Sequence, residues 1–149
     1  MLERALEGHA GLVADDRELR REGPSYMVDT LRSFRRQWPD RPLVLIVGQD
    51  AANGLDRWHR WRALFGLAHI VLTRRPGETP AYGPVLASEM ESRAVPEPAA
   101  LRRAPAGRVL YLEVQPLDIS STGVRDRLAA DAPVFQVAAL TGDGIPALA

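Results

Sequence analysis

Leu43-Val44-Leu45-Ile46-Val47-Gly48-Gln49-Asp50 is the stretch that decides the fold class. Its five consecutive apolar residues predict a strand that is covered on both faces, as in a parallel sheet. Gly48 ends this strand, and polar side chains follow at once. Two further strands are predicted at 69–73 and 109–113, because each is an apolar run that leads into polar or turn residues.

Helices are predicted between these strands. Ser25 is expected to cap a helix that ends before Pro39, since serine is a good N-cap and proline stops a helix. A second helical stretch is expected to carry Trp58 and Trp61 on one side. Residues 76–107 are rich in Pro, Gly and Ala and predict a long surface excursion with a short helix near 88–93, while residues 1–10 have helical spacing. Strands alternating with helices predict one α/β/α domain over residues 1–149, in three layers around a mostly parallel sheet.

Composition excludes several classes of protein. The 19 basic and 19 acidic residues give a net charge of +0, so no overall field would attract nucleic acid or an anionic membrane. All the basic residues are arginine, which would suit phosphate binding, but codon bias is the favoured explanation, because lysine is absent throughout the chain. No cysteine is present, so disulfides and thiolate metal sites are excluded. Without a signal peptide or an apolar run long enough to span a bilayer, the sequence predicts a cytoplasmic protein, and it leaves a homo-oligomer open.

Polar residues after the strands are the candidate ligand contacts, because ligands of parallel sheets bind beyond the carboxyl ends of the strands. Gly48 would allow a close backbone approach and Asp50 could accept hydrogen bonds from a ribose, but the segment alone favours a plain strand-to-helix turn with Asp50 as its N-cap. Trp58 and Trp61 could stack on a planar ligand or be core residues. Arg75 could bind a polyphosphate or sit in a solvated turn.

The segment Ile119-Ser120-Ser121-Thr122-Gly123-Val124-Arg125 gathers hydroxyls and backbone N–H groups at a predicted helix start. Phosphate binds favourably at such a position, and Arg125 lies one turn further in. A serine cap with a surface arginine is the alternative. His9, His59 and His69 lack metal-ligand spacing, and His69, at the start of a buried strand, favours a structural role.

Taken in order, several segments resemble the bacterial nicotinate mononucleotide adenylyltransferases of the nucleotidylyltransferase superfamily. The resemblance runs from about Met1 to about Leu128. It rests on Asp16-x-Glu18-x-x-Arg21, Gly23-Pro24-Ser25-Tyr26-x-Val28-Asp29-Thr30-Leu31, Val47-Gly48-Gln49-Asp50, Leu55-x-x-Trp58-x-x-Trp61, Arg74-Arg75-Pro76-Gly77 and Ile119-Ser120-Ser121-Thr122-x-Val124-Arg125.

This resemblance implies a Rossmann-like nucleotidylyltransferase domain that transfers the adenylyl group of ATP, used with Mg²⁺, to nicotinate mononucleotide. It implies that Tyr26, Met27 and His59 surround the pyridine ring, largely through backbone groups, and that Trp58 stacks on it. Gly48 and Asp50 would lie beside the nucleotide ribose. The ATP phosphates would be held by Ile119, Ser120, Thr122 and Arg125, with Arg75 a weaker candidate, and Arg125 would act in catalysis.

The sequence departs from the family pattern in four places. Met27 stands where the family has threonine, and His59 where it has tyrosine. Residues 131–149 lack the family's closing helix pattern. The family's opening strand and its Gly-x-Phe-x-Pro-x-His-x-Gly-His motif, whose histidines bind the ATP phosphates, do not occur, so the first β-α unit is expected to be missing and activity of the chain alone weak or absent. A non-catalytic nucleotide-binding or interaction protein derived from the family is the alternative. The related pantetheine-phosphate enzyme is disfavoured by the Pro-Ser-Tyr loop and the tryptophan pair.

Overall fold

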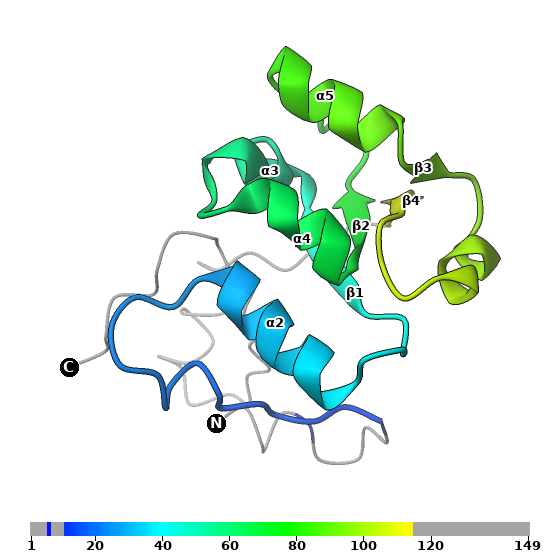
Figure 1. The fold of residues 1–149 in the computed structure, drawn as a ribbon. Helices are drawn as coiled ribbons and strands as arrows, with labels where there is room; N and C mark the ends of the chain where they lie inside the picture. Colours follow the sequence, from blue (N-terminus) through cyan, green and yellow to red (C-terminus); the bar gives the residue numbers. More distant parts are fainter. Residues whose placement is uncertain (1–5, 7–10, 115–149) are drawn as a thin grey trace, which may run out of the picture.

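The sheet of this protein has four strands, and every neighbouring pair runs parallel. The structure is a computed structural model and describes residue 6 and residues 11–114 (Figure 1). The strands lie in the order β1-β2-β4-β3, and their bounds are Val44–Gly48 for β1, His69–Arg74 for β2, Ala94–Val95 for β3 and Val109–Glu113 for β4. The prediction that the three long strands share one parallel sheet is confirmed. The short β3, inside the expected surface excursion, was not predicted.

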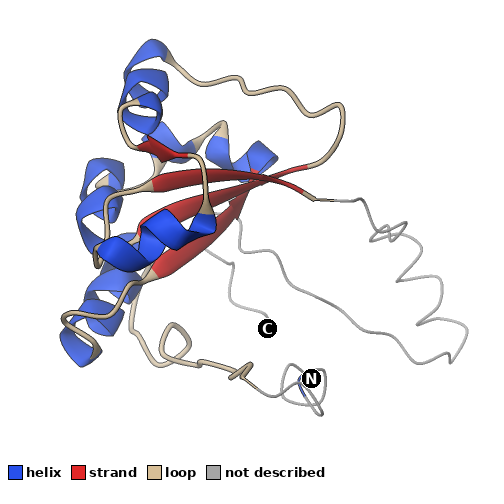
Figure 2. Cartoon of the chain, turned by 90° about the vertical axis from the view of Figure 1, so that its right-hand side faces the viewer, coloured by secondary structure: helices blue, strands red, loops and turns tan. Residues whose placement is uncertain are grey.

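Short helices connect the strands. The α-helices are α2 (Met27–Gln37), α3 (Gln49–Ala52), α4 (Trp61–Leu67) and α5 (Pro84–Glu91), and the 3-10 helices are η1 (Leu55–Arg57) and η2 (Pro98–Arg103). In Figure 2 the long connection from the end of β2 arches away from the sheet and returns to α5. Among the described residues, none of these helices is long and apolar enough to cross a bilayer.

Two apolar clusters on opposite faces of the sheet show its layers. The larger contains Ile70 and Leu72 of β2, together with buried residues from all four α-helices. The smaller pairs Val71 of β2 and Leu110 of β4 with Leu101 of η2. Because alternate strand residues point to opposite faces, the α-helices cover one face and η2 covers part of the other. The expected α/β class with helices on a parallel sheet is therefore observed.

One expectation for β1 is wrong. The sequence predicted a strand covered on both faces, yet Val44 is 44% and Ile46 68% exposed. Within residues 11–114, β1 is an edge strand of the sheet, and η2 packs on β2 and β4 instead. A continuous apolar run therefore predicts a strand, but burial of the second face depends on whether another layer packs against it.

Three helix predictions also need correction. α2 begins after Tyr26, and Ser25 does not cap it, because the Ser25 hydroxyl accepts from Arg21 instead. The second helical stretch is divided, so Trp58 follows η1 and only Trp61 belongs to α4. The excursion at 76–107 is not only surface, since it buries Leu86 and Met90 of α5 and Leu101 of η2 in the two clusters. Most of the helical segment expected at 1–10 lies outside the described residues.

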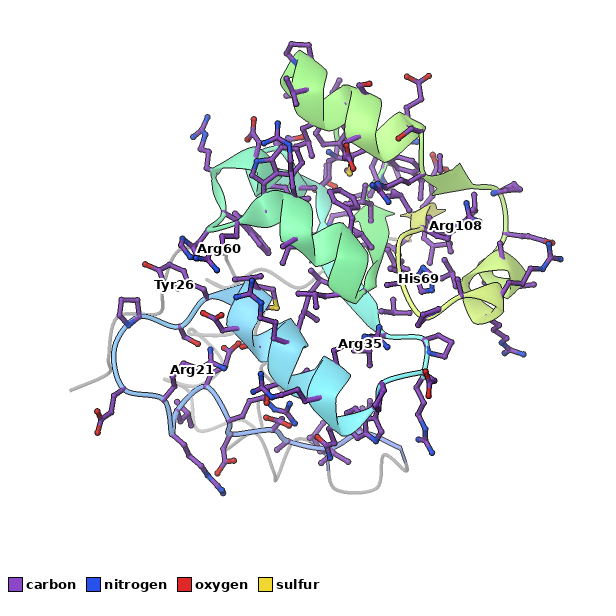
Figure 3. The ribbon with its side chains drawn as sticks, in the orientation of Figure 1. Arg21, Tyr26, Arg35, Arg60, His69 and Arg108 are labelled. Atoms are coloured by element: carbon purple, nitrogen blue, oxygen red, sulfur yellow. The ribbon has the colours of Figure 1, made fainter. Side chains whose placement is uncertain are left out.

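The Arg35 guanidinium joins three parts of the fold (Figure 3). It lies in the last turn of α2 and donates to five backbone carbonyls, those of Trp38 (3.2 Å), Pro39 (3.0 Å), Arg41 (2.8 Å), Leu67 (2.6 Å) and Pro105 (2.8 Å). These carbonyls belong to the loop after α2, to the end of α4 and to the loop before β4. Nη1 serves three of these carbonyls and Nη2 serves two, so one N–H of Nη1 is shared between two acceptors.

His69 makes a second connection between distant segments. Its side chain is fully buried at the start of β2. The backbone N–H of Arg108 donates to Nδ1 at 3.0 Å, so the hydrogen of the neutral ring is on Nε2, which donates to the carbonyl of Ala104 at 2.8 Å. The prediction of a structural histidine is confirmed.

Replacement of Arg35 by methionine should lower the free energy of unfolding by about 2–4 kcal/mol. Hydrogen bonds to a charged group contribute about 1.5–3 kcal/mol each, and the part-exposed carbonyls would regain some of this from water. Urea unfolding measures the change. Arg36→Met is the matched control, because Arg36 is exposed in the same helical turn. Equal losses in both variants would contradict the role given to Arg35.

Tyr111 of β4 should make stability fall at alkaline pH. Burial raises the pKa of Tyr111, and the neighbouring Tyr82 and Glu91 raise it further. The folded protein therefore keeps this proton more tightly, so the stabilisation is complete below about pH 10, the ordinary tyrosine pKa, and is lost as the pH rises through the folded pKa. The chain has no lysine or cysteine, so neither type of side chain contributes to a stability change in this pH range.

Urea unfolding between pH 8 and 11 tests this dependence. Tyr111→Phe, which cannot ionise, should lose less stability over that range than the unmodified chain. The same alkaline loss in both proteins would show that Tyr111 is not its source.

Candidate functional site

The carboxyl ends of the strands bring three predicted ligand contacts to one edge of the sheet. Gly48 pairs in register with Thr73, so β1 and β2 end side by side. Gly48 is exposed, and a Cβ added to it would meet no atom within 4 Å, so a ligand has room beside this backbone. Asp50 is exposed in the first turn of α3, and Arg75 is exposed directly after β2. All three lie at or directly after the strand ends, and their contacts with ribose and phosphate stay predictions.

A buried hydrogen-bond network holds the loop of residues 75–83 against α3. Gln49 is 2% exposed, and its Nε2 donates to Oδ1 of Asn53 (2.8 Å) and to the hydroxyl oxygen of Tyr82 (2.9 Å). The backbone N–H of Ala81 donates to the same Oδ1 of Asn53 at 2.9 Å. Sequence reasoning missed Asn53 and Tyr82, because no local pattern reports a contact that spans about thirty residues. The network fixes the path of the chain beyond β2.

Tyr26 and His59, both predicted to surround a pyridine ring, are in contact. Their rings stack with centroids 4.3 Å apart and planes inclined by 29°. Tyr26 immediately precedes α2, and His59 lies between η1 and α4. Both side chains are exposed, so the stack is open to solvent. Local sequence patterns could not predict this ring contact, because the two residues are far apart in the sequence and meet only through the packing of α2 on α4.

Arg60 has an unusual backbone conformation next to this stack. Its φ of 52° and ψ of 39° are left-handed, and it is the one non-glycine residue with positive φ in the part of the chain that the structure describes. Such a conformation costs a side-chain-bearing residue about 1–2 kcal/mol. It turns the chain from the exposed His59 into α4. Figure 3 shows Tyr26 and Arg60 at the neighbouring starts of α2 and α4.

Three further predicted contacts differ in how deeply their side chains are buried, namely Trp58, Trp61 and Met27. Trp61 is 9% exposed and packs edge-on against Phe65, so the core reading holds for this indole. Trp58 is half-buried at the margin of the core. Met27 also packs at the margin of the core, so it would meet a ligand through its backbone. Stacking by Trp58 stays a prediction.

The predicted phosphate contacts Ile119, Ser120, Thr122 and Arg125 lie outside the described residues. Across residues 11–114, no three His, Asp or Glu side chains gather as a set of metal ligands. Arg74, next to Arg75, is engaged in an ion pair with Glu113 at 2.7 Å. Arg75 is therefore the exposed member of the arginine pair at this strand end.

A largely apolar cavity of about 480 Å³ lies away from these contacts, between α2 and β1. It is lined by Asp15, Arg17, Glu18, Met27, Thr30, Leu31, Phe34, Trp38, Leu43, Val44 and Leu45. A hydrogen bond from Arg17 holds the pKa of the Asp15 carboxyl below its ordinary value. Met27 is the single predicted site residue among those that line it. The cavity is thus not the candidate ligand site.

Comparison with known proteins gives close relatives. No family model matches the chain. A protein of Methylococcus capsulatus named "Probable nicotinate-nucleotide adenylyltransferase" is 50% identical over 129 residues, which are 86% of this chain and 61% of that protein. Proteins of the same name from Halorhodospira halophila and Marinobacter nauticus are 46% and 45% identical, over 87% of this chain. The chain spans 59 to 61% of the length of these three relatives.

Proposed function

Because this chain belongs to the nicotinate-nucleotide adenylyltransferase family, we propose that it serves adenylyl transfer from ATP to nicotinate mononucleotide. The products would be nicotinate adenine dinucleotide and pyrophosphate, and the reaction would belong to NAD biosynthesis in the cytoplasm. The observation that carries this proposal is the Tyr26–His59 stack. It joins the two segments that the family motifs assign to one pyridine ring.

The ring site would be formed by the starts of α2 and α4. No side chain caps α2, and the N–H groups of Asp29 and Thr30 donate to the Tyr26 carbonyl, so among the described residues the N–H groups of Met27 and Val28 are the ones left for a carboxylate. In this proposal, backbone groups of Tyr26, Met27 and His59 receive the carboxylate of the pyridine, and Trp58 stacks on the ring. An acid rather than an amide suits these donors, since a carboxylate is acceptor-only.

The carboxyl ends of β1 and β2 would contact the ribose and the phosphates of the substrates. Gly48 and Asp50 would contact the ribose, and Arg75 would contribute charge to the phosphates, because all three are exposed beyond the strand ends. Ile119, Ser120, Thr122 and Arg125 would bind the remaining phosphates of ATP. Mg²⁺ would enter with ATP, bound to the polyphosphate as part of that substrate.

The chemistry is a direct displacement. A phosphate oxygen of the mononucleotide would form a bond to the α-phosphorus of ATP, and the bond from that phosphorus to the bridging oxygen of pyrophosphate would break. Catalysis of this type depends on positioning and on neutralising charge. Arg125 is the proposed catalytic contact of this chain, since a guanidinium can stabilise the negative charge that develops on the phosphate oxygens.

Trp58→Ala should weaken binding of nicotinate mononucleotide roughly tenfold and leave MgATP binding nearly unchanged, because ring stacking contributes about 0.5–1.5 kcal/mol beyond area burial. Isothermal titration calorimetry with each nucleotide separately measures both affinities. Trp38→Ala is the matched control, since Trp38 stacks on Phe34 at the far end of α2. Similar losses for both nucleotides would assign Trp58 a packing role.

The 149-residue chain should bind nicotinate mononucleotide but release no measurable pyrophosphate from MgATP. Its sequence does not contain the Gly-x-Phe-x-Pro-x-His-x-Gly-His motif. Loss of even one well-placed transition-state donor costs roughly a hundredfold to a thousandfold in rate. A coupled pyrophosphate assay with both substrates tests this expectation. Turnover at an ordinary enzymatic rate would contradict it, whereas nucleotide binding without turnover is also what a non-catalytic binding protein would show.

A further inference from the structure

A hydrogen-bond network links the loop before α2 to the first turns of that helix. Arg21 donates through one nitrogen, Nη1, to the hydroxyl oxygens of Ser25 and Thr30, each at 3.3 Å. The Thr30 hydroxyl donates to the Glu18 carboxylate. Thr30 is 7% exposed, so the network is attached to a buried point of α2. The residues of this network have no role in the reaction proposed above.

The Thr30 hydroxyl fixes the donor and acceptor roles in this network. A hydroxyl has one hydrogen, which Thr30 gives to Glu18, and its oxygen is then free to accept from Arg21. The carboxylate and the guanidinium therefore polarise the same hydroxyl from opposite sides, and hydrogen bonds with a charged partner are the stronger kind. Removing the Thr30 hydroxyl breaks both bonds, whereas removing Arg21 or Glu18 breaks one of them.

Tyr26 lies in the sequence between the two residues that Arg21 binds. The bond to Ser25 closes the loop of residues 21–25, and the bond to Thr30 ties that loop to α2. The loop has few other constraints, because Gly23 has a φ of 82° and both Gly23 and Pro24 are exposed. The position of the half-exposed Tyr26 ring on His59 therefore depends on what holds Ser25 and Thr30.

We propose that Arg21, acting with Glu18 and Thr30, is a positioning residue that holds the Tyr26 ring against His59. The Tyr26–His59 stack, which we call the ring-binding wall, is then formed before a ligand arrives. The consequence of this positioning for nicotinate mononucleotide rests on the proposed function, whereas the effect of Arg21 on the Tyr26–His59 stack does not. A preformed wall binds more tightly because less ordering remains to be done on binding.

A nearby arginine provides a matched control. Arg20 pairs with Asp16 at 2.6 Å, four residues apart on the same segment, and their side chains are 77% and 57% exposed. Exposed pairs of this kind contribute little to stability. Arg20→Gln removes the same charge from the same segment without touching Ser25 or Thr30.

The stack can be observed by NMR of the full 149-residue chain without any ligand. The face of the Tyr26 ring shields the His59 ring protons, and the chain has only three histidines, so their signals are few. Arg21→Gln, Ser25→Ala and Thr30→Val should move the His59 signals downfield, towards unshielded values. Arg20→Gln and Thr30→Ser, which keeps the hydroxyl, should leave them in place. Signals of the buried His69 report whether each variant keeps its fold.

Unchanged His59 signals in Arg21→Gln and Ser25→Ala would overturn the proposal, as would an equal change in Arg20→Gln. Calorimetry with nicotinate mononucleotide then forms the second arm. Arg21→Gln should weaken this binding about tenfold, and MgATP binding should stay constant. If the His59 signals move as expected while the unmodified chain binds no mononucleotide, the positioning role stands and the proposed function fails.

Discussion

The fold depends on one guanidinium more than on any other polar group in the described residues. Arg35 gathers the ends of α2 and α4 and the loop before β4, through five carbonyl oxygens. The same loop is fixed from the other side by His69, which bonds to Ala104 and Arg108. Unpaired carbonyls at helix ends need donors, and a side chain with several donors can serve them together. These contacts fix the amino end of the sheet.

The opposite end of the sheet has a different character. Gly48, Asp50 and Arg75 are exposed where β1 and β2 end, and Gln49, Asn53 and Tyr82 hold the neighbouring loop. A fixed loop beside open backbone is the arrangement that ligand binding requires, because the scaffold is ordered in advance and the contact groups stay free. The hydrogen bonds of Arg35 and His69 thus lie at one end of the strands, and the candidate ligand contacts lie at the other.

The stack of Tyr26 on His59 shows how packing brings distant motifs together. The two residues belong to separate segments, and their rings meet because α2 lies against α4. The left-handed Arg60 turns the chain from His59 into α4, and Arg21 links the loop before α2 to Thr30. In the sequence, the Glu18, Arg21 and Thr30 positions are only parts of a motif. In the structure they are one network, which gives a physical reason for their spacing.

The sequence by itself determined the parallel sheet, the main helix and the polar residues at the strand ends, because periodicity and turn residues act locally. It also indicated the family. Only the tertiary structure decided that Ile46 is exposed, that Ser25 serves Arg21 rather than a helix cap, that β3 joins the sheet, and that Gln49 reaches Tyr82. Each of these depends on which segments become neighbours in space, and a local pattern carries no information about a partner that lies many residues away along the chain.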